Sequence, residues 1–507
     1  MATLIWAGLA LTEAGQQPQT NYALYVEGNR IVDADSYAAL RLRYPDARQM
    51  GGNDFFMLPA MINSHDHGRG LGTLQLGVPD DLLEIWLPGL YSQPKIDPYL
   101  LARYEGQLLL RAGVGTTAHS HNPQNWLHMA SEAAATLRGY REAGIRVAFH
   151  PPITDQNPLI YAERERFLAG LPATVQEAAA PFLRPTPLTQ ADYFDGCTRL
   201  FEQHHDADQH TVHIQVSPAG GQWCSDEVTL AAVAFAQRHG TRVQMHMLET
   251  AYQRIYAFKR WGKSFIQHLG EIGVLGPWLT LAHMVWIEAE DLPLLAEYGV
   301  GVAHNPSSNL RLRSGVAPVP ALLKQGIKVG VGLDGQALDD DQDYLRELRL
   351  AWTLANRPQA AAQTVTAAEV FQMGTRSGSA ITLGGATPLG ALIPGALADL
   401  VLLDWPEIQG VWSSPETPAL DILLRRASKQ QVVHVLVSGE WVVRDRKSTR
   451  IDETEVIAEI RENLKRYDPA VLAQTGAAAK ALAPYLRRFY ATWDTNTLPT
   501  RHFVGWS

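Results

Sequence analysis

LPAMINSHDH, residues 58–67, is an apolar run that ends in two histidines one residue apart. In an extended strand, residues i and i+2 point to the same face. His65 and His67 can therefore grip one metal ion at the end of a strand, and Asp66 points away. The run predicts a first strand that ends in a metal site.

Four later segments place polar residues directly after a short β-forming run; they are HMLET at 246–250, AHM at 282–284, AHNPSSN at 303–309 and GLDG at 332–335. From His246 through His283 and His304 to Asp334, the steps are 37, 21 and 30 residues. A (β/α)₈ barrel uses about 30 residues per strand–helix unit, since eight units make up about 250 residues. Each motif is therefore expected at the C-terminal end of a successive barrel strand, where barrel active sites lie. Further strands are expected at 114–117, 145–149 and 212–216, which brings the count to eight.

In order and spacing, these motifs resemble the amidohydrolase superfamily, and within it the branch of chlorohydrolases and aminohydrolases that act on triazines, purines and related N-heterocycles. The residues that carry the match are LPAMINSHDH, HMLET, AHMVW, VAHNPSSNLRLRSGVAPVPALLKQGIKVGVGLDG and LGALIPGALADLVLLD. The resemblance extends to about residue 445. It implies an α/β fold: a (β/α)₈ barrel beside a small β-sandwich.

The resemblance also implies a site around one divalent metal. The implied metal ligands are His65, His67, His246 and Asp334. Glu249 and His283 are implied as catalytic residues, and His304 as a residue on the substrate side.

The chemistry of these residues supports the same assignment. Imidazole nitrogen and carboxylate oxygen suit Zn²⁺, the metal expected first, or Fe²⁺. A bound metal lowers the pKa of water to about 7. Asp334 can hold the proton of that water while it ligates the metal, which makes it a catalytic residue too. Glu249 is placed to shuttle a proton onto a ring nitrogen of the substrate. His283 can orient the water or stabilise charge on the tetrahedral centre.

Each histidine also has a structural interpretation, because a lone histidine at a strand end is more often packed and hydrogen-bonded than a ligand. His304 can instead hold the loop that Pro306 and Asn309 shape. His119 and His121 form another pair on one face, and they either line the pocket or serve the structure. They stay outside the metal set, since four ligands already complete it.

Three parts of the chain separate by pattern. Residues 1–57 and 386–446 alternate strand and turn signals, which predicts antiparallel sheet. Neither end alone has enough strands to bury a core, and the resemblance implies that the two meet as one composite β-sandwich. Residues 58–385 form the predicted barrel. Residues 447–507 form a predicted helical extension, amphipathic over 453–467 and 478–493, that packs on the barrel or on a second subunit.

Composition excludes several classes of protein. The 507 residues are ample for a large core, and the net charge of −9 with interspersed signs argues against a nucleic-acid surface. Two cysteines, Cys197 and Cys224, suit a reducing cytoplasm. The apolar run at 4–11 lacks a basic region before it and predicts a strand rather than a signal peptide. No segment approaches the ~18 apolar residues of a membrane helix. We expect a cytoplasmic enzyme with a small-molecule substrate, and the resemblance implies a homo-oligomer.

The loop after the first strand, residues 68–87, is expected to cover the pocket. Trp86 can stack on a flat substrate or serve as a core aromatic of the following helix. Arg69 and Gln75 can contact polar ring edges, although solvent-facing or loop-bracing roles are the alternative for each.

Trp223 lies in SPAGGQWCS at 217–225 and is a further candidate substrate contact. That segment has Ala219 where adenosine-type deaminases of the branch often carry a substrate-binding histidine. The absence of this histidine weakens a nucleoside assignment.

Two further stretches have open roles. Four carboxylates at 339, 340, 341 and 343 either favour a cationic substrate or form a solvated helix N-terminus, the favoured interpretation. The long stretch 150–210 is either a lid or a surface excursion.

Together the motifs predict a metal-dependent hydrolase that cleaves a C–N bond of a small nitrogen-rich compound. An s-triazine, a pterin, a purine or pyrimidine base, or a guanidine fits, with ammonia, an alkylamine or halide as leaving group. The alternatives are a ring-opening or linear amide hydrolase that uses the same metal site, and a metal-free relative that serves as a binding or scaffold protein.

Overall fold

The fold was analysed in a computed structural model of the chain. It describes residues 2–156, 159–179, 182, 187–206, 208–335, 337–356, 360 and 365–495. Residues 496–507 of the predicted helical extension lie outside the described residues, and so do short parts of the 150–210 stretch.

Two four-stranded sheets, parallel throughout, form the centre of the molecule. The first contains β5 (Met61–Asp66), β6 (Val114–Ser120), β7 (Arg146–His150) and β9 (Val212–Ile214), and the second contains β11 (Val243–Met247), β12 (Leu279–His283), β13 (Gly301–His304) and β14 (Val329–Val331). Almost every residue of these strands is buried. This burial on both faces accounts for their nearly unbroken apolar sequences.

Hydrogen bonds join the two sheets at both of their edges. At one edge the amide of Gln244 donates to the carbonyl of Val216 at 3.2 Å. At the other, the amide of Asp334 donates to the carbonyl of His65 at 2.9 Å, just beyond β14 and within β5. The ends of β5, β11, β12 and β14 thereby face a common space.

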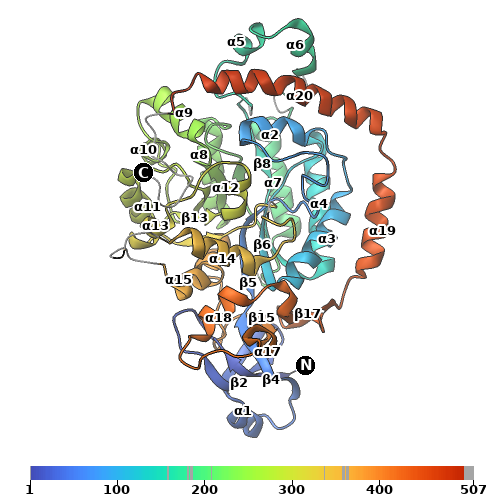
Figure 1. The fold of residues 1–507 in the computed structure, drawn as a ribbon, viewed down its shortest axis with the longest axis vertical. Helices are drawn as coiled ribbons and strands as arrows, with labels where there is room; N and C mark the ends of the chain where they lie inside the picture. The colour runs from blue at the N-terminus through green and yellow to red at the C-terminus, as the bar shows by residue number, and fades with distance from the viewer. Residues whose placement is uncertain are drawn as a thin grey trace.

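Helices follow the strands and cover the sheets (Figure 1). They are α3 (Pro98–Arg111), α4 (Met129–Ala143), α7 (Gln190–His204), α8 (Asp226–His239), α9 (Ala251–Trp261), α10 (Phe265–Glu271), α11 (Leu292–Tyr298), α12 (Pro306–Arg311), α13 (Val319–Lys324), α14 (Tyr344–Leu354), α15 (Ala367–Met373) and α16 (Arg376–Thr382). Helix α8 shows why they begin and end where they do. The side chain of Ser225 accepts from the amide of Val228, and Gly240 closes the helix at a φ of 62°.

Shorter elements lie in the connections. They are β8 (Pro152–Ile153), β10 (Ser217–Pro218), α2 (Leu83–Leu90), α5 (Arg164–Ala169), α6 (Ala173–Ala179) and the 3₁₀ turns Trp126–His128, Ala289–Asp291 and Lys429–Gln431. Of these, α2 belongs to the loop that was expected to cover the pocket.

The two chain ends meet in one eight-stranded sheet, seen at the bottom of Figure 1. Its order is β18 (Lys447–Ser448), β17 (Glu440–Arg444), β16 (Val432–Val437), β15 (Leu400–Asp404), β4 (Arg48–Pro59), β1 (Thr3–Ala10), β2 (Gln19–Glu27) and β3 (Arg30–Ser36). Helices α1 (Tyr37–Arg43), α17 (Trp405–Gln409) and α18 (Ala419–Arg426) accompany it.

One feature of this sheet corrects the sequence prediction of antiparallel pairing throughout. Strands β1 and β4 pair in parallel, with Thr3 opposite Arg48. The cause is the path of the chain between them: β2, β3 and α1 intervene, and a crossover returns the chain beside β1 in the same direction. Strand β4 then leads directly into β5 and so connects this sheet to the site.

The C-terminal extension packs on the molecule itself. Helix α19 (Glu453–Leu464) lies against α3, where Glu459 pairs with Arg103 at 2.8 Å. Helix α20 (Pro469–Ala491) crosses above α2 (Figure 1) and buries Leu482 and Leu486 in a cluster with Ile85. Among the described residues, the extension packs on α2 and α3, beside the central strands. Within the described ranges, no helix combines the length and apolar character needed to cross a membrane.

A buried ion pair connects the composite sheet to the central strands. Arg146 on β7 donates from Nη2 to both carboxylate oxygens of Asp399 at 3.0 Å, and both side chains are buried. Replacing Asp399 by alanine should lower the free energy of unfolding by about 3–5 kcal/mol, because the Arg146 charge then remains buried and unpaired. Urea denaturation monitored by circular dichroism measures the change. Glu407→Ala is the matched control, since its pair with Arg446 is exposed and worth about 0–1 kcal/mol. Equal losses in the two variants would contradict the assignment.

Candidate active site

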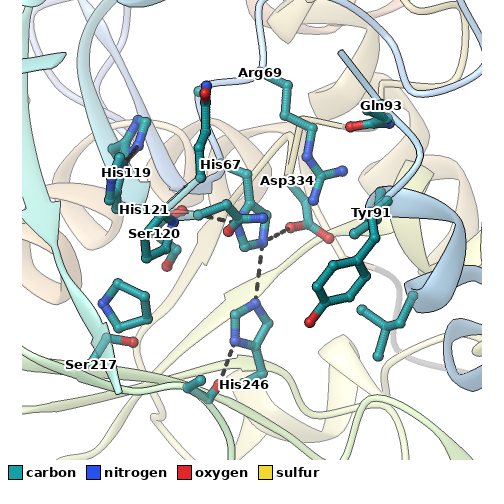
Figure 2. Close-up of a pocket in the computed structure, with 18 of the residues that line it drawn as sticks. His67, Arg69, Tyr91, Gln93, His119, Ser120, His121, Ser217, His246 and Asp334 are labelled. Atoms are coloured by element: carbon teal, nitrogen blue, oxygen red, sulfur yellow. Dashed lines mark hydrogen bonds and ion pairs between the residues drawn. The ribbon is translucent and has the colours of Figure 1, made fainter. Parts of the chain in front are cut away.

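Four side chains from four strand ends form a compact group of metal-ligand type. Donor atoms of His65, His246, His283 and Asp334 all lie within 4.8 Å of one another. The Nε2 atom of His67 joins them, at 3.1 Å from Asp334 Oδ1 and 3.2 Å from His246 Nε2 (Figure 2). The structure therefore brings together all four predicted ligands and places His283 beside them.

The backbone at these strand ends is turned sharply toward the site. His283 has a φ of 78° and Asp334 a φ of 59°, both in the left-handed region that non-glycine residues rarely adopt. Such conformations are typical of active sites. Gly332 allows two segments to approach closely, because a Cβ there would lie 2.4 Å from Asn305 Oδ1 and 2.7 Å from the carbonyl oxygen of His65.

Hydrogen bonds at the Nδ1 atoms orient the histidines. Nδ1 of His65 lies 2.7 Å from Gln244 Oε1, and Nδ1 of His246 lies 2.6 Å from the carbonyl of Ala219. Nδ1 of His67 lies 2.9 Å from the carbonyl of Ser120 and 2.9 Å from Asn122 Oδ1. Since these acceptors bind a protonated Nδ1, each Nε2 keeps its lone pair, the arrangement found behind metal-bound histidines.

The group fits a divalent metal by an independent observation. The Nε2 atom of His283 is buried and has no hydrogen-bond partner among the described residues, and that of His65 is buried with Asp334 Oδ1 at 3.1 Å. Buried polar atoms are nearly always partnered, so the unpaired nitrogen of His283 points to a ligand. Three imidazoles and one carboxylate form a donor set suited to Zn²⁺ or Fe²⁺.

Burial and mutual contact set the protonation of the group. Burial lowers the pKa of His246 well below its ordinary value and that of His283 to about 4, so both rings are neutral. Burial alone would raise the pKa of Asp334, but His65 and His67 outweigh it and hold that pKa well below its usual range. Burial would lower the pKa of His65, but the adjacent Asp334 carboxylate raises it above the ordinary value. For His246 and Asp334, the neutral imidazole and the ionised carboxylate are the forms that bind metals.

Glu249 is a buried carboxyl of a different kind. Burial raises its pKa well above the ordinary value, and the nearby Asp334 and Glu84 raise it further. Its Oε2 lies 3.7 Å from His283 Nε2. The amide of Glu249 donates to Gln253 Oε1 at 2.8 Å, which holds the turn after β11. A protonated carboxyl beside the metal group is suited to donate a proton.

A cavity of about 440 Å³ opens beside this group, within the usual size range of small-molecule sites. Its inner end contains His67, His246, Glu249, His283 and Asp334, and its walls are mostly apolar. His119 and His121 line it, as do the predicted substrate contacts Arg69, Trp86 and Trp223.

Trp86 serves as a core aromatic and also borders the cavity. It is only 4% exposed and packs in the main core, yet it lines the cavity. The Trp223 ring lies 6.0 Å from that of His246, edge to face. Both tryptophans therefore flank the space in front of the metal group.

Two predicted substrate contacts lie elsewhere. Gln75 is exposed on the 68–82 loop, where its Oε1 accepts from the amide of Gly72 at 3.2 Å, and it is absent from the described cavity lining. The loop turns back on itself there and directs Gln75 to solvent, so its loop-bracing role is the one observed. His304 is buried at the end of β13, also away from the described lining, and burial lowers its pKa to about 3.

The acidic stretch after Asp334 forms ion pairs instead of facing the cavity. Asp339 pairs with Arg346 at 2.9 Å, and Asp340 pairs with Arg311. Asp343 caps α14 by accepting from the amide of Arg346. The helix N-terminus interpretation agrees with the cap at Asp343, and the ion pairs of Asp339 and Asp340 favour it over the cationic-substrate alternative.

Sequence reasoning missed a buried carboxyl that braces the cavity wall. Glu84 on α2 accepts at Oε1 from the hydroxyl of Tyr161 at 3.0 Å and from that of Thr250, the neighbour of Glu249. The Tyr161 ring in turn meets Tyr490 of α20 at 5.6 Å. Glu84 thus links α2, the 150–210 stretch and the turn that contains Glu249 and Thr250. No local sequence pattern indicates these contacts.

Gln244 was also missed, although a signal existed. It lies two residues before His246 on the same strand, so period-2 alternation places it on the same face. Its side chain holds His65 from across the site and donates to the carbonyl of Ser64 at 2.9 Å.

Comparison with curated proteins gives several relatives along most of the chain. A 5′-deoxyadenosine deaminase from Methanopyrus kandleri is 32% identical over 419 residues, which cover 82% of this chain and 87% of the relative. An 8-oxoguanine deaminase from Pseudomonas aeruginosa is 30% identical over 449 residues, covering 86% of this chain and 93% of the relative.

Solved structures share the fold. An adenosine deaminase from Xanthomonas campestris, solved with bound zinc, is 24% identical with a TM-score of 0.75, covering 92% of this chain and 98% of its own. An atrazine chlorohydrolase from Arthrobacter aurescens TC1, complexed with zinc, is 23% identical with a TM-score of 0.76, covering 91% of this chain and all of its own. At these identities, the likeness establishes the α/β fold alone.

The family assignment rests on the sequence as a whole. The profile of the amidohydrolase family matches residues 56–442, which include every strand of both parallel sheets. Together with the two deaminase relatives, this match confirms the predicted resemblance. The chain belongs to the amidohydrolase family and is a hydrolase of carbon–nitrogen bonds other than peptide bonds.

Proposed function

We propose that this protein is a metal-dependent aminohydrolase that releases ammonia or an amine from a C–N bond of a small nitrogen-rich heterocycle. The observation that carries the proposal is the grouping of buried imidazoles and one carboxylate beside the buried Glu249, on the wall of a cavity of about 440 Å³. The deaminase relatives act on purine compounds by name, which supports the reaction type.

Each residue of the group has a role that follows from its protonation. The ligands would be His65, His67, His246 and Asp334, and the bound ion supplies Lewis acidity that lowers the pKa of water to about 7. Asp334, ionised, can accept the proton of the attacking water. Glu249, protonated, can donate to the ring nitrogen next to the reacting carbon and so make that carbon more electrophilic.

Departure of the amine needs a second proton transfer. Glu249 faces the cavity beside His283, so it can take the proton that Asp334 releases and pass it to the leaving nitrogen. His283 is neutral and held by Asn309 Oδ1, 2.9 Å from its Nδ1. With Nδ1 donating to Asn309, its Nε2 lone pair can accept a hydrogen bond from the attacking water and orient it. The heterocycle would lie between Trp86 and Trp223, with Arg69 at its edge.

The finer architecture is part of the same proposal. The two parallel sheets would form one (β/α)₈ barrel over residues 58–385, and residues 1–57 with 386–446 would form the small β-domain. The hydrogen bonds at both edges of the sheets support closure of the barrel.

Zinc is the expected ion, with Fe²⁺ as the alternative. Both cysteines are unpaired and buried, which supports a cytoplasmic location, and a homo-oligomer is expected from the resemblance.

Metal analysis of the purified protein, paired with a screen for ammonia release, tests the proposal. The screen covers triazines, pterins, purines, pyrimidines and guanidines. We expect close to one ion per chain and turnover of one heterocycle class with its ring intact. A ring-opened product would favour the amide hydrolase alternative. Protein that holds no metal even after incubation with Zn²⁺ would favour the metal-free binding relative.

A further inference from the structure

Arg69 is a cation at the catalytic cavity whose donors remain unused. It lies two residues after His67, and its guanidinium carbon is 5.1 Å from the centre of the Trp86 ring. Its Nη1 is buried without a hydrogen-bond partner among the described residues. The side chain lines the cavity directly beside Asp334 (Figure 2).

The carboxylates near Arg69 are already engaged. Asp66 accepts from the amides of His67 and Gly68 at 2.7 and 3.0 Å. Glu105 accepts from the amide of Gly70 at 2.9 Å. Asp334 contacts the histidines of the metal group. These groups balance the charge of Arg69 without taking its N–H donors, and the side chain lines the cavity.

A guanidinium has five N–H donors in a rigid planar fork and no acceptor. A buried donor that stays unpaired costs free energy, so the ligand that fills this cavity should bring an acceptor to Arg69. Trp86 lies against the same guanidinium and offers a flat apolar face. The pair is therefore suited to a planar ring whose edge carries an oxygen acceptor.

We propose that Arg69 selects amino-heterocycles that also carry a ring oxo group, such as amino-oxo purines, pyrimidines, pterins or triazines. Its fork donates to the oxo oxygen and, where one lies on the same edge, to an unprotonated ring nitrogen, while the amino-bearing carbon faces Glu249 and Asp334. The inference rests on the proposed function and narrows its substrate class. Arg69 acts in binding and specificity, and the chemistry at the amino carbon stays as described above.

Matched substrate pairs test this selection. Guanine and 2-aminopurine form one pair, and ammeline and melamine form another; each pair differs at the oxo position. In the wild-type protein, we expect kcat/KM to favour the oxo member by about 10²-fold or more, since sites built to hydrogen-bond a substrate group discriminate strongly against its absence. Arg69→Met should remove most of that preference by lowering kcat/KM for the oxo member alone. Arg69→Lys should restore part of it, because it keeps the charge and loses the fork.

Lys95→Met is the matched control. Among the described residues that line the cavity, Lys95 is the only lysine or arginine besides Arg69. Its Nζ already donates to the carbonyl of Gln124 at 2.9 Å. Loss of this charge should leave the oxo preference unchanged. An equal loss of kcat/KM for both members in Arg69→Met would overturn the inference, as would a wild-type preference for the members that lack the oxo group.

Calorimetric binding to the zinc-loaded protein gives a readout that does not need turnover. We expect Arg69→Met to raise the Kd of the oxo heterocycles by at least about tenfold. The Kd of the matched compounds that lack the oxo group should change by less than about threefold. Failure of all pairs to release ammonia would count against the proposed function, whereas turnover or binding without an oxo preference would overturn only the role of Arg69. Preferential binding of a carboxylate-bearing heterocycle that lacks an oxo group would overturn it too.

Discussion

Replacing Glu249 by glutamine should lower kcat by about 10²–10⁴-fold, the usual contribution of a positioned proton donor. Glutamine has nearly the same size and can still occupy the turn after β11, but its amide cannot deliver a proton to a ring nitrogen. Glu249 is outside the four predicted ligands, so metal content should stay at the wild-type level. Steady-state kinetics on the substrate found in the screen, with metal analysis of the same sample, measures both effects.

Glu227→Gln provides the matched control, since Glu227 is exposed in the first turn of α8, away from the described cavity lining. Its kcat should equal that of the wild type. A Glu249→Gln protein that keeps more than about a tenth of the wild-type kcat would remove Glu249 from the chemistry. Loss of the metal in the same variant would instead show that Glu249 holds the metal ligands in position.

Replacing Asp334 by asparagine should abolish turnover and weaken metal binding by more than about 10–100-fold. Mutation of a residue that only hydrogen-bonds to a metal ligand already weakens binding by roughly that factor, and Asp334 is a proposed ligand itself. Two interactions are lost at once. The carboxylate contributes the charge of the ligand set, at 3.1 Å from both His65 and His67. It is also the ionised group that can accept the proton of the attacking water. Competition with a chromogenic chelator measures the affinity.

The control for Asp334 comes from the same segment. Asp339 is exposed and paired with Arg346, so Asp339→Asn should retain metal and leave KM unchanged for neutral and cationic compounds alike. An Asp334→Asn protein with wild-type metal affinity would show that the histidines alone hold the ion. A raised KM for cationic compounds in Asp339→Asn would revive a substrate role for the acidic stretch.

The composite sheet and the C-terminal extension both contact elements that carry or border the site. Asp399, from the returning chain, anchors the first residue of β7 through Arg146. Helix α20 meets the cavity wall through Tyr490, whose hydroxyl donates to the carbonyl of Leu159, a cavity-lining residue, at 2.9 Å. These contacts hold the strand ends and α2 at fixed positions, which a site of converging side chains requires.

The sequence by itself determined the features that depend on local periodicity. Two-residue alternation placed His65 and His67 on one face of a strand, and the steps between later motifs placed His246, His283 and Asp334 at successive strand ends. Their convergence within 4.8 Å follows once the strands are parallel and adjacent. The family was therefore accessible before any coordinates, and the resemblance to it supplied the proposed ligands and proton donor.

Only the tertiary structure decided which loop side chains reach the cavity. Arg69 and Gln75 lie six residues apart on one loop, yet the first lines the cavity and the second faces solvent. The loop has no regular period, so its path depends on what it packs against. The contacts of Glu84 with Tyr161 and Thr250, which lie 77 and 166 residues away in the sequence, likewise depend on how distant segments pack together.

The direction of β4 beside β1 and the pairing of the acidic stretch also belong to the tertiary structure. A crossover rather than a hairpin precedes β4, and arginines distant in sequence, such as Arg311, neutralise the carboxylates after Asp334. Local sequence sets which face a side chain occupies, because backbone geometry repeats every two or 3.6 residues. It leaves open which distant group meets that face, because the encounter depends on the burial and packing of the whole chain.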